Sequence, residues 1–294
     1  MAEEKPRMNL DRKLYKGIVV HDNDEFPRLE KMEIRDDDIW VCSFPRSGTT
    51  LTQELVYLVE TLDFKKVYEV QLDERFPIVG VKDERFPYYQ GIDHIEKLPS
   101  PRMLKCHLHH FMLPEQLRNG KGRIIYICRN PKDIASSFFR LMQWADLLLE
   151  EEKSFDYFIE EFVNGTGLGC PWPRHLLEYW EKRNENVLFL KYEEVIKDLP
   201  KTVRSISDFL KKDLSDEDIK KISDYCQFNN MKSNDKCNMS YYRTFKHVND
   251  EAEGGFMNKG KAGVWRDLLK PEVAARIDGM IRQLDGTGLE IPDV

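Results

Sequence analysis

The chain has 294 residues, of which 41% are hydrophobic, so it can fold around a sizeable core and is not intrinsically disordered. Its 45 lysines and arginines against 52 aspartates and glutamates leave a net charge of −7. That balance excludes a global electrostatic affinity for nucleic acid, so any site for a polyanion has to be local.

The first 37 residues are charged and irregular, and we expect residues 1–37 to form an arm packed on a single domain that spans 38–294. This domain begins with an apolar run at 39–42, which predicts a buried strand of a parallel sheet. A tight turn follows, and from Thr50 onward apolar residues recur at helical spacing, beginning with Leu51. A strand, a short glycine-containing turn and a helix form an anion site, because the first N–H groups of the helix have no partner within it.

The turn carries the side chains that such an anion site needs. Arg46 is a fixed cation close to Gly48, and three further residues supply hydroxyl donors: Ser47, Thr49 and Thr50. We interpret the turn as a phosphate loop, the alternative being an ordinary connection between a strand and a helix. It is not a Walker A motif, G-x-x-x-x-G-K-[ST], because a threonine and not a lysine follows Gly48.

The sequence Asp-Glu-Arg-Phe-Pro occurs at 73–77 and again at 83–87. A period this short, present only twice, does not indicate a solenoid. Two Phe-Pro turns close to tyrosines predict a loop with aromatic tips at Phe76 and Phe86. Such a loop could close over a ligand or be an ordinary surface loop.

Three more buried strands are predicted at 102–107, 123–128 and 186–192. Helices are predicted around them, with caps at Asn130 and at the pair Ser215 and Asp218, over 131–149, 155–163, 174–183, 200–212, 216–226 and 271–284. Buried strands that alternate with helices indicate an α/β fold, a single domain with a central parallel sheet flanked by helices. Between 227 and 265 the pattern fails, and an irregular segment of that length is typical of a lid or binding element.

Ligands of such folds bind at the carboxyl ends of the strands, where Arg46, His107, Arg129 and Tyr192 lie in the sequence. Lys105 and His107 stand two apart on one strand, so their side chains share a face. Together they offer a cation for a leaving group and a base for an incoming hydroxyl. The guanidinium fork of Arg129 suits a phosphate, the alternative being a structural arginine that caps carbonyl groups.

A metal site is the alternative for the three histidines His107, His109 and His110. No carboxylate or cysteine ligand accompanies them at a suitable spacing, and the neighbouring Lys105 would repel a cation. We therefore expect no metal.

Several features predict a cytoplasmic protein with no membrane partner. No apolar segment approaches 18 residues, and the N-terminus lacks the apolar region of a signal peptide. The six cysteines are scattered, which suits buried thiols in a reducing compartment.

Four segments resemble, in the expected order, the motifs of the cytosolic sulfotransferase family. Residues 43–51 are similar to the family's TYPKSGTTW loop, with Arg46 and Leu51 in place of its lysine and tryptophan. Residues 105–107 are similar to its K-T-H motif. Residues 126–137 resemble its element for the 3′-phosphate, and the phosphate loop of the family is similar to a P-loop.

The late part of the chain carries the remaining likeness. Residues 256–265 resemble the family's F-M-R-K-G-x-x-G-D-W, with Asn258 and Val264 replacing its arginine and aspartate. In addition to these four segments, residues 226–231 match the family's T-S-F…M segment, with Cys226 replacing the threonine.

The resemblance spans roughly residues 38 to 278 and implies a transferase that moves a sulfonyl group from 3′-phosphoadenosine 5′-phosphosulfate (PAPS) to a hydroxyl or amine of a small acceptor. The product would be 3′-phosphoadenosine 5′-phosphate (PAP), and no metal would be needed. His107 would deprotonate the acceptor, and Lys105 and Arg46 would stabilise the developing charge. Ser137 would bind the 3′-phosphate and restrain the loop cation. The implied donor contacts are Arg46, Ser47, Gly48, Thr49, Thr50, Leu51, Arg129, Ser137, Tyr192, Cys226, Phe228, Met231, Phe256, Met257, Asn258, Lys259 and Gly260.

For the acceptor, the resemblance implies a pocket between the helix after Ser137 and the loops of Phe76 and Phe86. The expected contacts are Lys105, His107, Phe76, Phe86, Leu141, Ala145 and Tyr241. Apolar and aromatic walls suit a phenol. Three carboxylates would favour an acceptor that carries an ammonium group, such as a phenolic biogenic amine. They are Asp83, Glu84 and Asp146, and the alternative is that they are solvated surface charges.

The sequence leaves two alternative functions open. A catalytically weak or inactive binding protein of the same fold is favoured by substitutions that weaken the donor site, at Arg46, Leu51, Cys226, Asn258 and Val264. A P-loop kinase is disfavoured by the missing glycine-lysine order. The family's dimer motif is altered here between 266 and 275, so the chain could be a monomer or a homodimer.

Overall fold

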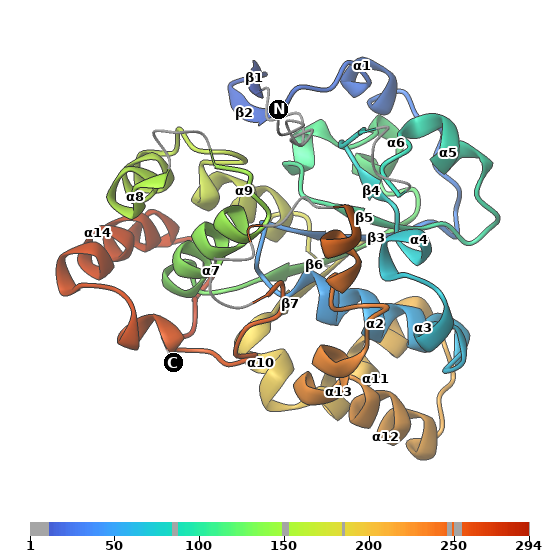
Figure 1. Ribbon diagram of the computed structural model, residues 1–294. Coiled ribbons are helices and arrows are strands. Elements are labelled where there is room, and N and C mark those ends of the chain that lie inside the picture. Colours follow the sequence, from blue (N-terminus) through green and yellow to red (C-terminus); the bar gives the residue numbers. More distant parts are fainter. Residues whose placement is uncertain are drawn as a thin grey trace, which may run out of the picture.

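The centre of the molecule is a parallel sheet of five strands in the order β4-β5-β3-β6-β7 (Figure 1). The computed structural model describes residues 12–83, 88–148, 153–183, 186–245, 249 and 255–293. The strands are β3 (Ile39–Ser43), β4 (Ile78–Val79), β5 (Met103–Cys106), β6 (Arg123–Cys128) and β7 (Val187–Lys191). Four of them lie within one residue of their predicted ends. β4 was not predicted, because two residues are too few to show a pattern.

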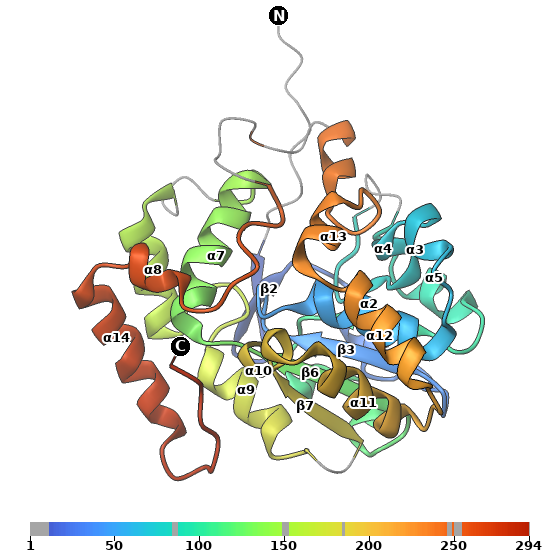
Figure 2. The ribbon, with the colours of Figure 1, turned by 90° about the horizontal axis from the view of Figure 1, so that it is seen from below.

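The sheet is buried on both faces. Trp40 and Cys42 of β3 pack into one apolar cluster, whereas Ile39 and Val41 pack into another. Alternate side chains of a strand point to opposite faces, so a strand that is apolar throughout has to be covered on both sides. Helices accordingly lie on both sides (Figures 1 and 2). One side has α2 (Thr49–Thr61), α10 (Tyr192–Lys197), α11 (Leu199–Leu210), α12 (Asp216–Tyr225) and α13 (Phe228–Ser233); the other has α7 (Pro131–Trp144), α8 (Phe155–Asn164), α9 (Trp172–Trp180) and α14 (Pro271–Ile281).

The predicted caps are present at the starts of two helices. The side chain of Asn130 caps α7, and a capping box begins at Ser215 before α12. α7 ends at Trp144 and not at 149 as predicted. Just beyond it, Asp146 has a left-handed φ of 51°, which is incompatible with a continuing helix.

The N-terminal region is not irregular where the structure describes it, so that part of the prediction is wrong. β1 (Arg12–Tyr15) and β2 (Ile18–His21) form an antiparallel hairpin, and α1 (Phe26–Leu29) follows. Ile18 and Phe26 are buried in the same cluster as the central strand β3. A two-stranded hairpin is only marginally stable alone, and packing against the sheet stabilises this one. The sequence did not predict it because such short segments show no periodic pattern.

The remaining elements are short connections. They are helices α3 (Lys66–Glu69), α4 (Leu72–Arg75), α5 (Ile92–Lys97) and α6 (Glu115–Arg118), and 3₁₀ helices at His110–Met112, Ser240–Phe245, Val264–Asp267 and Arg282–Leu284. The segment 227–265 therefore contains short helices, although the sequence indicated none. Within the described ranges, no helix combines the length and the apolar character needed to cross a membrane.

Candidate active site

A cavity of about 260 Å³ lies at the carboxyl ends of the central strands. Its wall contains nearly all the residues expected to contact a donor, namely Arg46, Gly48, Thr49, Thr50, Leu51, Arg129, Ser137, Tyr192, Cys226, Phe228, Met231, Phe256, Met257, Asn258, Lys259 and Gly260. Ser47 does not line it; this residue is fully buried, and its Oγ has no hydrogen-bond partner among the described residues. Lys105, His107 and Leu141 from the expected acceptor side line the same cavity.

The turn between β3 and α2 has the backbone of a phosphate loop. Arg46 and Gly48 adopt left-handed φ values of 70° and 106°. A Cβ on Gly48 would lie 2.6 Å from Cδ2 of Tyr192, so a side chain there would displace the tyrosine ring. α2 starts at the next residue, Thr49, and its N-terminal turn lines the cavity. The N–H groups and the positive end of the helix dipole therefore face the space where an anion would bind.

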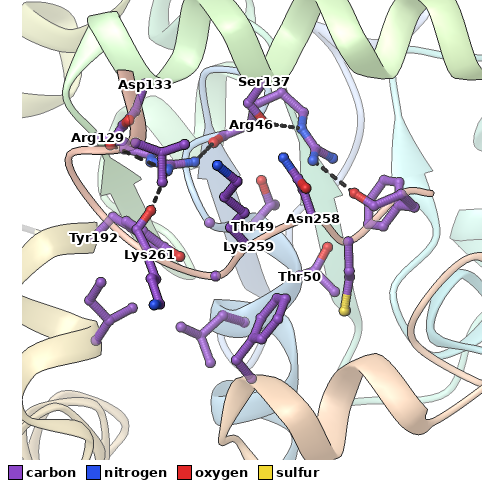
Figure 3. Close-up of a pocket in the computed structure, with 18 of the residues that line it drawn as sticks. Arg46, Thr49, Thr50, Arg129, Asp133, Ser137, Tyr192, Asn258, Lys259 and Lys261 are labelled. Atoms are coloured by element: carbon purple, nitrogen blue, oxygen red, sulfur yellow. Dashed lines mark hydrogen bonds and ion pairs between the residues drawn. The ribbon is translucent and has the colours of Figure 1, made fainter. Parts of the chain in front are cut away.

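Arg46 spans the cavity from this loop to two other elements. Its Nε donates a hydrogen bond of 3.0 Å to Oγ of Ser137 on α7, and its Nη2 donates one of 2.8 Å to the carbonyl of Phe256 (Figure 3). The contact with Ser137 is the one that the family resemblance implied for the loop cation. Burial, and then the positive charge of Arg129, lower the pKa of Arg46 to about 10, so it stays charged near neutral pH.

Arg129 joins the phosphate loop to the late loop of the chain. Its Nη1 donates to the carbonyl of Arg46 at 3.3 Å and its Nη2 to that of Lys261 at 3.0 Å. The guanidinium lies 4.5 Å from the ring centroid of Tyr192, and Nη2 lies 3.4 Å from Oδ2 of Asp133 (Figure 3). The Nε of Arg129 is buried and has no hydrogen-bond partner among the described residues.

Asp133 holds the late loop, a contact that the sequence did not reveal beyond the place of Asp133 in the first turn of a helix. Its carboxylate accepts hydrogen bonds of 2.9 Å from the backbone N–H groups of Gly263 and Trp265. These contacts fix the end of the late loop against α7. The only signal available was an acidic residue after the cap, which the helix dipole alone explains.

His107 has the protonation state that a general base requires. Its Nδ1 lies 2.9 Å from the carbonyl oxygen of Ser43, which can only accept, so Nδ1 carries the proton and Nε2 is the basic nitrogen. Burial and the positive charge of Lys105 lower the pKa of His107 to about 3. The imidazole is therefore neutral at physiological pH. Oγ of Ser43 lies 3.2 Å from Nδ1 of His107 and 2.7 Å from Oγ1 of Thr49. The phosphate loop therefore helps to orient the imidazole ring.

A second neutral histidine supports this arrangement from behind. His175 on α9 is completely buried; its Nε2 donates to the carbonyl of His107 at 3.2 Å, and its Nδ1 accepts from the hydroxyl of Tyr126 at 2.9 Å. Burial, followed by the charge of His109, holds the pKa of His175 well below its usual range.

These buried histidines predict a loss of stability in acid. Below about pH 6.5 the unfolded chain binds a proton at each histidine, whereas folded His107 and His175 do not, so the free energy of unfolding falls as the pH is lowered. Each contributes up to about 1.4 kcal/mol per pH unit. His175→Gln keeps a donor for the carbonyl of His107. Measured by urea titrations between pH 4.5 and 6.5, it should reduce the slope of the free energy of unfolding against pH by up to about 1.4 kcal/mol per pH unit, the contribution of one proton. Equal slopes for both proteins would contradict the neutral His175; at pH 8 the slopes should coincide.

The comparisons with known proteins agree with this geometry. The sequence model of the sulfotransferase domain matches residues 36–287. The chain belongs to the sulfotransferase family.

Relatives and solved structures of sulfotransferases cover most of the chain. It is 33% identical to the amine sulfotransferase of Oryctolagus cuniculus, over 87% of this chain and 83% of that protein. It is 34% identical to the luciferin sulfotransferase of Photinus pyralis, over 85% and 72% respectively. A crystal structure of retinol dehydratase in complex with androsterone and inactive cofactor PAP superposes with a TM-score of 0.83, at 30% identity, over 95% of this chain and 90% of that one. The predicted family, fold class and enzyme class, a PAPS-dependent transferase, are thereby confirmed.

The acceptor side of this sulfotransferase differs from its prediction. Phe76 is not an aromatic loop tip; it is completely buried in the cluster beneath α2, where α4 places it. Ala145 is also buried in that cluster, and neither it nor Tyr241 lines the cavity. Asp146 is exposed and lies outside the cavity wall.

Phe86 and Glu84 fall outside the described residues, so their predicted roles stay predictions. Tyr241 donates a hydrogen bond to Asp73, a buried residue that the sequence analysis did not single out. The loop prediction failed because burial of Phe76 depends on packing against α2, which is distant in the sequence.

The histidines do not gather around a common point that could hold a metal. Among the described residues, no group of three or more histidine, cysteine, aspartate or glutamate side chains is arranged to hold one. The Nε2 of His109 bonds to the carbonyl of Gly169 at 3.1 Å, and the ring of His110 packs edge-on against Tyr179.

Proposed function

We propose that this sulfotransferase uses PAPS as donor and a small phenol, or a phenolic amine, as acceptor. The observation that carries the proposal is a neutral histidine, His107, beside the cation Lys105 at the end of a phosphate loop. A general base needs a ring nitrogen that can accept a proton, and Nε2 of His107 is that nitrogen because Nδ1 donates to the carbonyl of Ser43.

The cavity suits a nucleotide with several phosphate charges. Among the described lining residues, Asp133 supplies the single carboxylate. Six lining residues are cations, namely Arg46, Lys105, Arg129, Arg140, Lys259 and Lys261. In a chain with a net charge of −7, this concentration is local and therefore specific to the site. A Cβ on Gly260 would lie 2.1 Å from Cδ2 of Phe228, so the late loop packs closely on the apolar wall provided by α13.

Each residue then has a distinct task. When bound, the donor supplies the sulfonyl group and leaves as PAP. Nε2 of His107 takes the proton of the acceptor hydroxyl, while Lys105 and Arg46 stabilise negative charge on the transferring and departing oxygens. Arg129 and Ser137 hold the 3′-phosphate. The adenine would pack against Phe228 and neighbouring apolar residues: Leu51, Cys226 and Met231.

The preference for a small acceptor rests on the cavity that it shares with the donor. Both molecules have to bind there together, with the acceptor beside Leu141 and His107. Asp146 is exposed and lies outside the wall, so it does not favour an ammonium group on an acceptor bound in the cavity. We therefore rank neutral phenols and phenolic amines together and bulky sterols below them. The buried, unlinked cysteines fit a cytoplasmic enzyme.

Transfer of labelled sulfonyl groups from PAPS tests the function and the acceptor together. With 4-nitrophenol, dopamine and a hydroxysteroid as acceptors, we expect the two phenols to have kcat/KM values within about tenfold of each other and above that of the steroid, since a bulky ring system is excluded sterically. A steroid that exceeded both phenols by tenfold would refute the narrow site. Tight binding of PAP with no transfer to any acceptor would identify a binding protein instead of an enzyme.

A further inference from the structure

We propose that Asp73 is a positioning residue that holds the ammonium group of Lys105 at the reaction centre. The inference rests on the proposed function, in which Lys105 stabilises charge on the transferring group. Nζ of Lys105 lies 3.9 Å from Oδ1 of Asp73. Among the described residues, this aspartate supplies the carboxylate that lies within 4 Å of the ammonium group.

The burial of Asp73 shows that its charge needs a partner. Its side chain is 1% exposed, against 10% for Lys105, which lines the cavity. Oδ2 accepts a hydrogen bond from the hydroxyl of Tyr241, whereas Oδ1 accepts none from any described residue. A buried carboxylate is costly unless an opposite charge or hydrogen bonds compensate it, and a tyrosine hydroxyl supplies no charge. Lys105 is the compensating cation.

The backbone around Asp73 is fixed relative to the active site. Asp73 belongs to α4, whose Arg75 donates hydrogen bonds of 3.0 and 2.6 Å to both carboxylate oxygens of Glu54. Both of these side chains are buried, and Glu54 belongs to α2, the helix that starts at the phosphate loop. The pair therefore ties α4 to the element that forms the anion site.

The same segment is also tied to the strand that carries Lys105. α4 leads into β4, which pairs in parallel with β5 so that Ile78 lies opposite Lys105. The backbone N–H of Lys105 donates to the carbonyl of Pro77 at 3.0 Å. Both ends of the contact between Asp73 and Lys105 are thus held by ordered backbone, and the side chains meet without a mobile link.

A lysine in this cavity requires such an anchor. Its ammonium group sits on a flexible four-carbon stem, and it lines the same cavity as the positive charge of Arg46. Repulsion from the cationic wall favours rotamers that turn Nζ toward solvent. A carboxylate behind the lysine opposes that movement. At 3.9 Å the contact is too long to be a hydrogen bond, so the ammonium protons stay available to the cavity.

The first test compares two variants of α4 that lose the same charge. Asp73→Asn keeps the shape and an acceptor for Tyr241 but removes the carboxylate. We expect kcat to fall at least about tenfold, a smaller loss than the 10²–10³-fold that removal of a charge-stabilising group itself causes. The Kd of PAP should change less than about threefold. Glu74→Gln alters the adjacent, exposed residue and should leave kcat unchanged. A kcat for Asp73→Asn within twofold of wild type would overturn the proposal.

The second test asks whether Asp73 acts through Lys105. In a Lys105→Gln background, adding Asp73→Asn should cause no further loss of kcat, because no ammonium group remains to be held. An equal loss in both backgrounds would show that Asp73 acts on the fold, and the proposal would be wrong.

A stability cycle in the donor-free protein gives a readout independent of activity. Lys105→Gln leaves the buried carboxylate without a cation and should lower the Tm by about 5 °C, and adding Asp73→Asn should restore most of that loss. No loss of Tm in Lys105→Gln, or no recovery in the double variant, would overturn the pairing. The cycle decides the pairing even if Asp73→Asn alone does not fold. Absence of sulfonyl transfer by the wild-type protein would refute only the proposed function.

Discussion

Replacing His107 by alanine is expected to lower turnover by roughly 10²–10⁴-fold, the usual contribution of a general base. The hydrogen bond from Nδ1 to the carbonyl of Ser43 leaves Nε2 as the nitrogen that can take a proton, and the lowered pKa of about 3 keeps that nitrogen unprotonated. Alanine removes the acceptor for the proton without filling the space. The measurement is steady-state transfer from labelled PAPS to 4-nitrophenol at saturating donor.

Two controls separate loss of the base from loss of the site. The Kd of PAP, measured by calorimetry, should stay near that of the wild-type protein, because His107 contacts neither the loop cation nor Arg129 by any hydrogen bond that the structure shows. His94→Ala changes a half-exposed histidine on α5, outside the cavity wall, and should leave turnover unchanged. Turnover of His107→Ala within a few-fold of wild type would remove this residue from the mechanism.

The phosphate loop and the catalytic pair could be predicted because their signals are local. An apolar strand, a glycine that alone tolerates a φ of 106°, and a helix start occupy consecutive residues around Gly48. Lys105 and His107 share a face by strand geometry alone. The parallel order of the sheet then brings Arg46 and His107 to one edge, although 61 positions separate them in the sequence.

The acceptor side could not be predicted, since it depends on contacts between distant segments. Phe76 looks like a loop tip in the sequence, but it is buried in the apolar cluster beneath α2, and Arg75 next to it pairs with Glu54 of that helix. The carboxylate of Asp73 lies 3.9 Å from Lys105, whereas Asp146 is exposed and outside the cavity wall. A pairing between two short motifs leaves no periodic signal, so neither residue could be placed from its neighbours.

The structure indicates that the substitutions in the donor motifs weaken the donor site less than the sequence suggested. Arg46 replaces the lysine of the family loop, yet its fork contacts Ser137 and the carbonyl of Phe256 at the same time. Asn258 lacks the charge of the family's arginine, but the same cavity wall includes Arg140. The site therefore stays strongly cationic, which favours an enzyme over a binding protein that has lost its donor.

Replacing Arg129 by alanine should weaken the binding of PAP by about 2–5 kcal/mol, or roughly 30-fold to a few thousandfold, because a phosphate loses a charged and bidentate partner. Arg129 lines the cavity beside the phosphate loop and carries a fixed positive charge. Calorimetry of PAP and of adenosine 5′-phosphate gives the comparison. If Arg129 binds the 3′-phosphate, affinity for PAP falls and affinity for adenosine 5′-phosphate changes little.

The ratio of the two affinities also excludes an indirect effect. Arg129 donates to the carbonyls of Arg46 and Lys261, so its loss could disturb both loops without any contact to the ligand. Disturbed loops would weaken both nucleotides equally, whereas a lost phosphate contact weakens only PAP. Arg204→Ala, an exposed arginine paired with Asp216 on the far helices, should change neither affinity. A wild-type protein that bound both nucleotides equally well would show that Arg129 holds loops and not a 3′-phosphate.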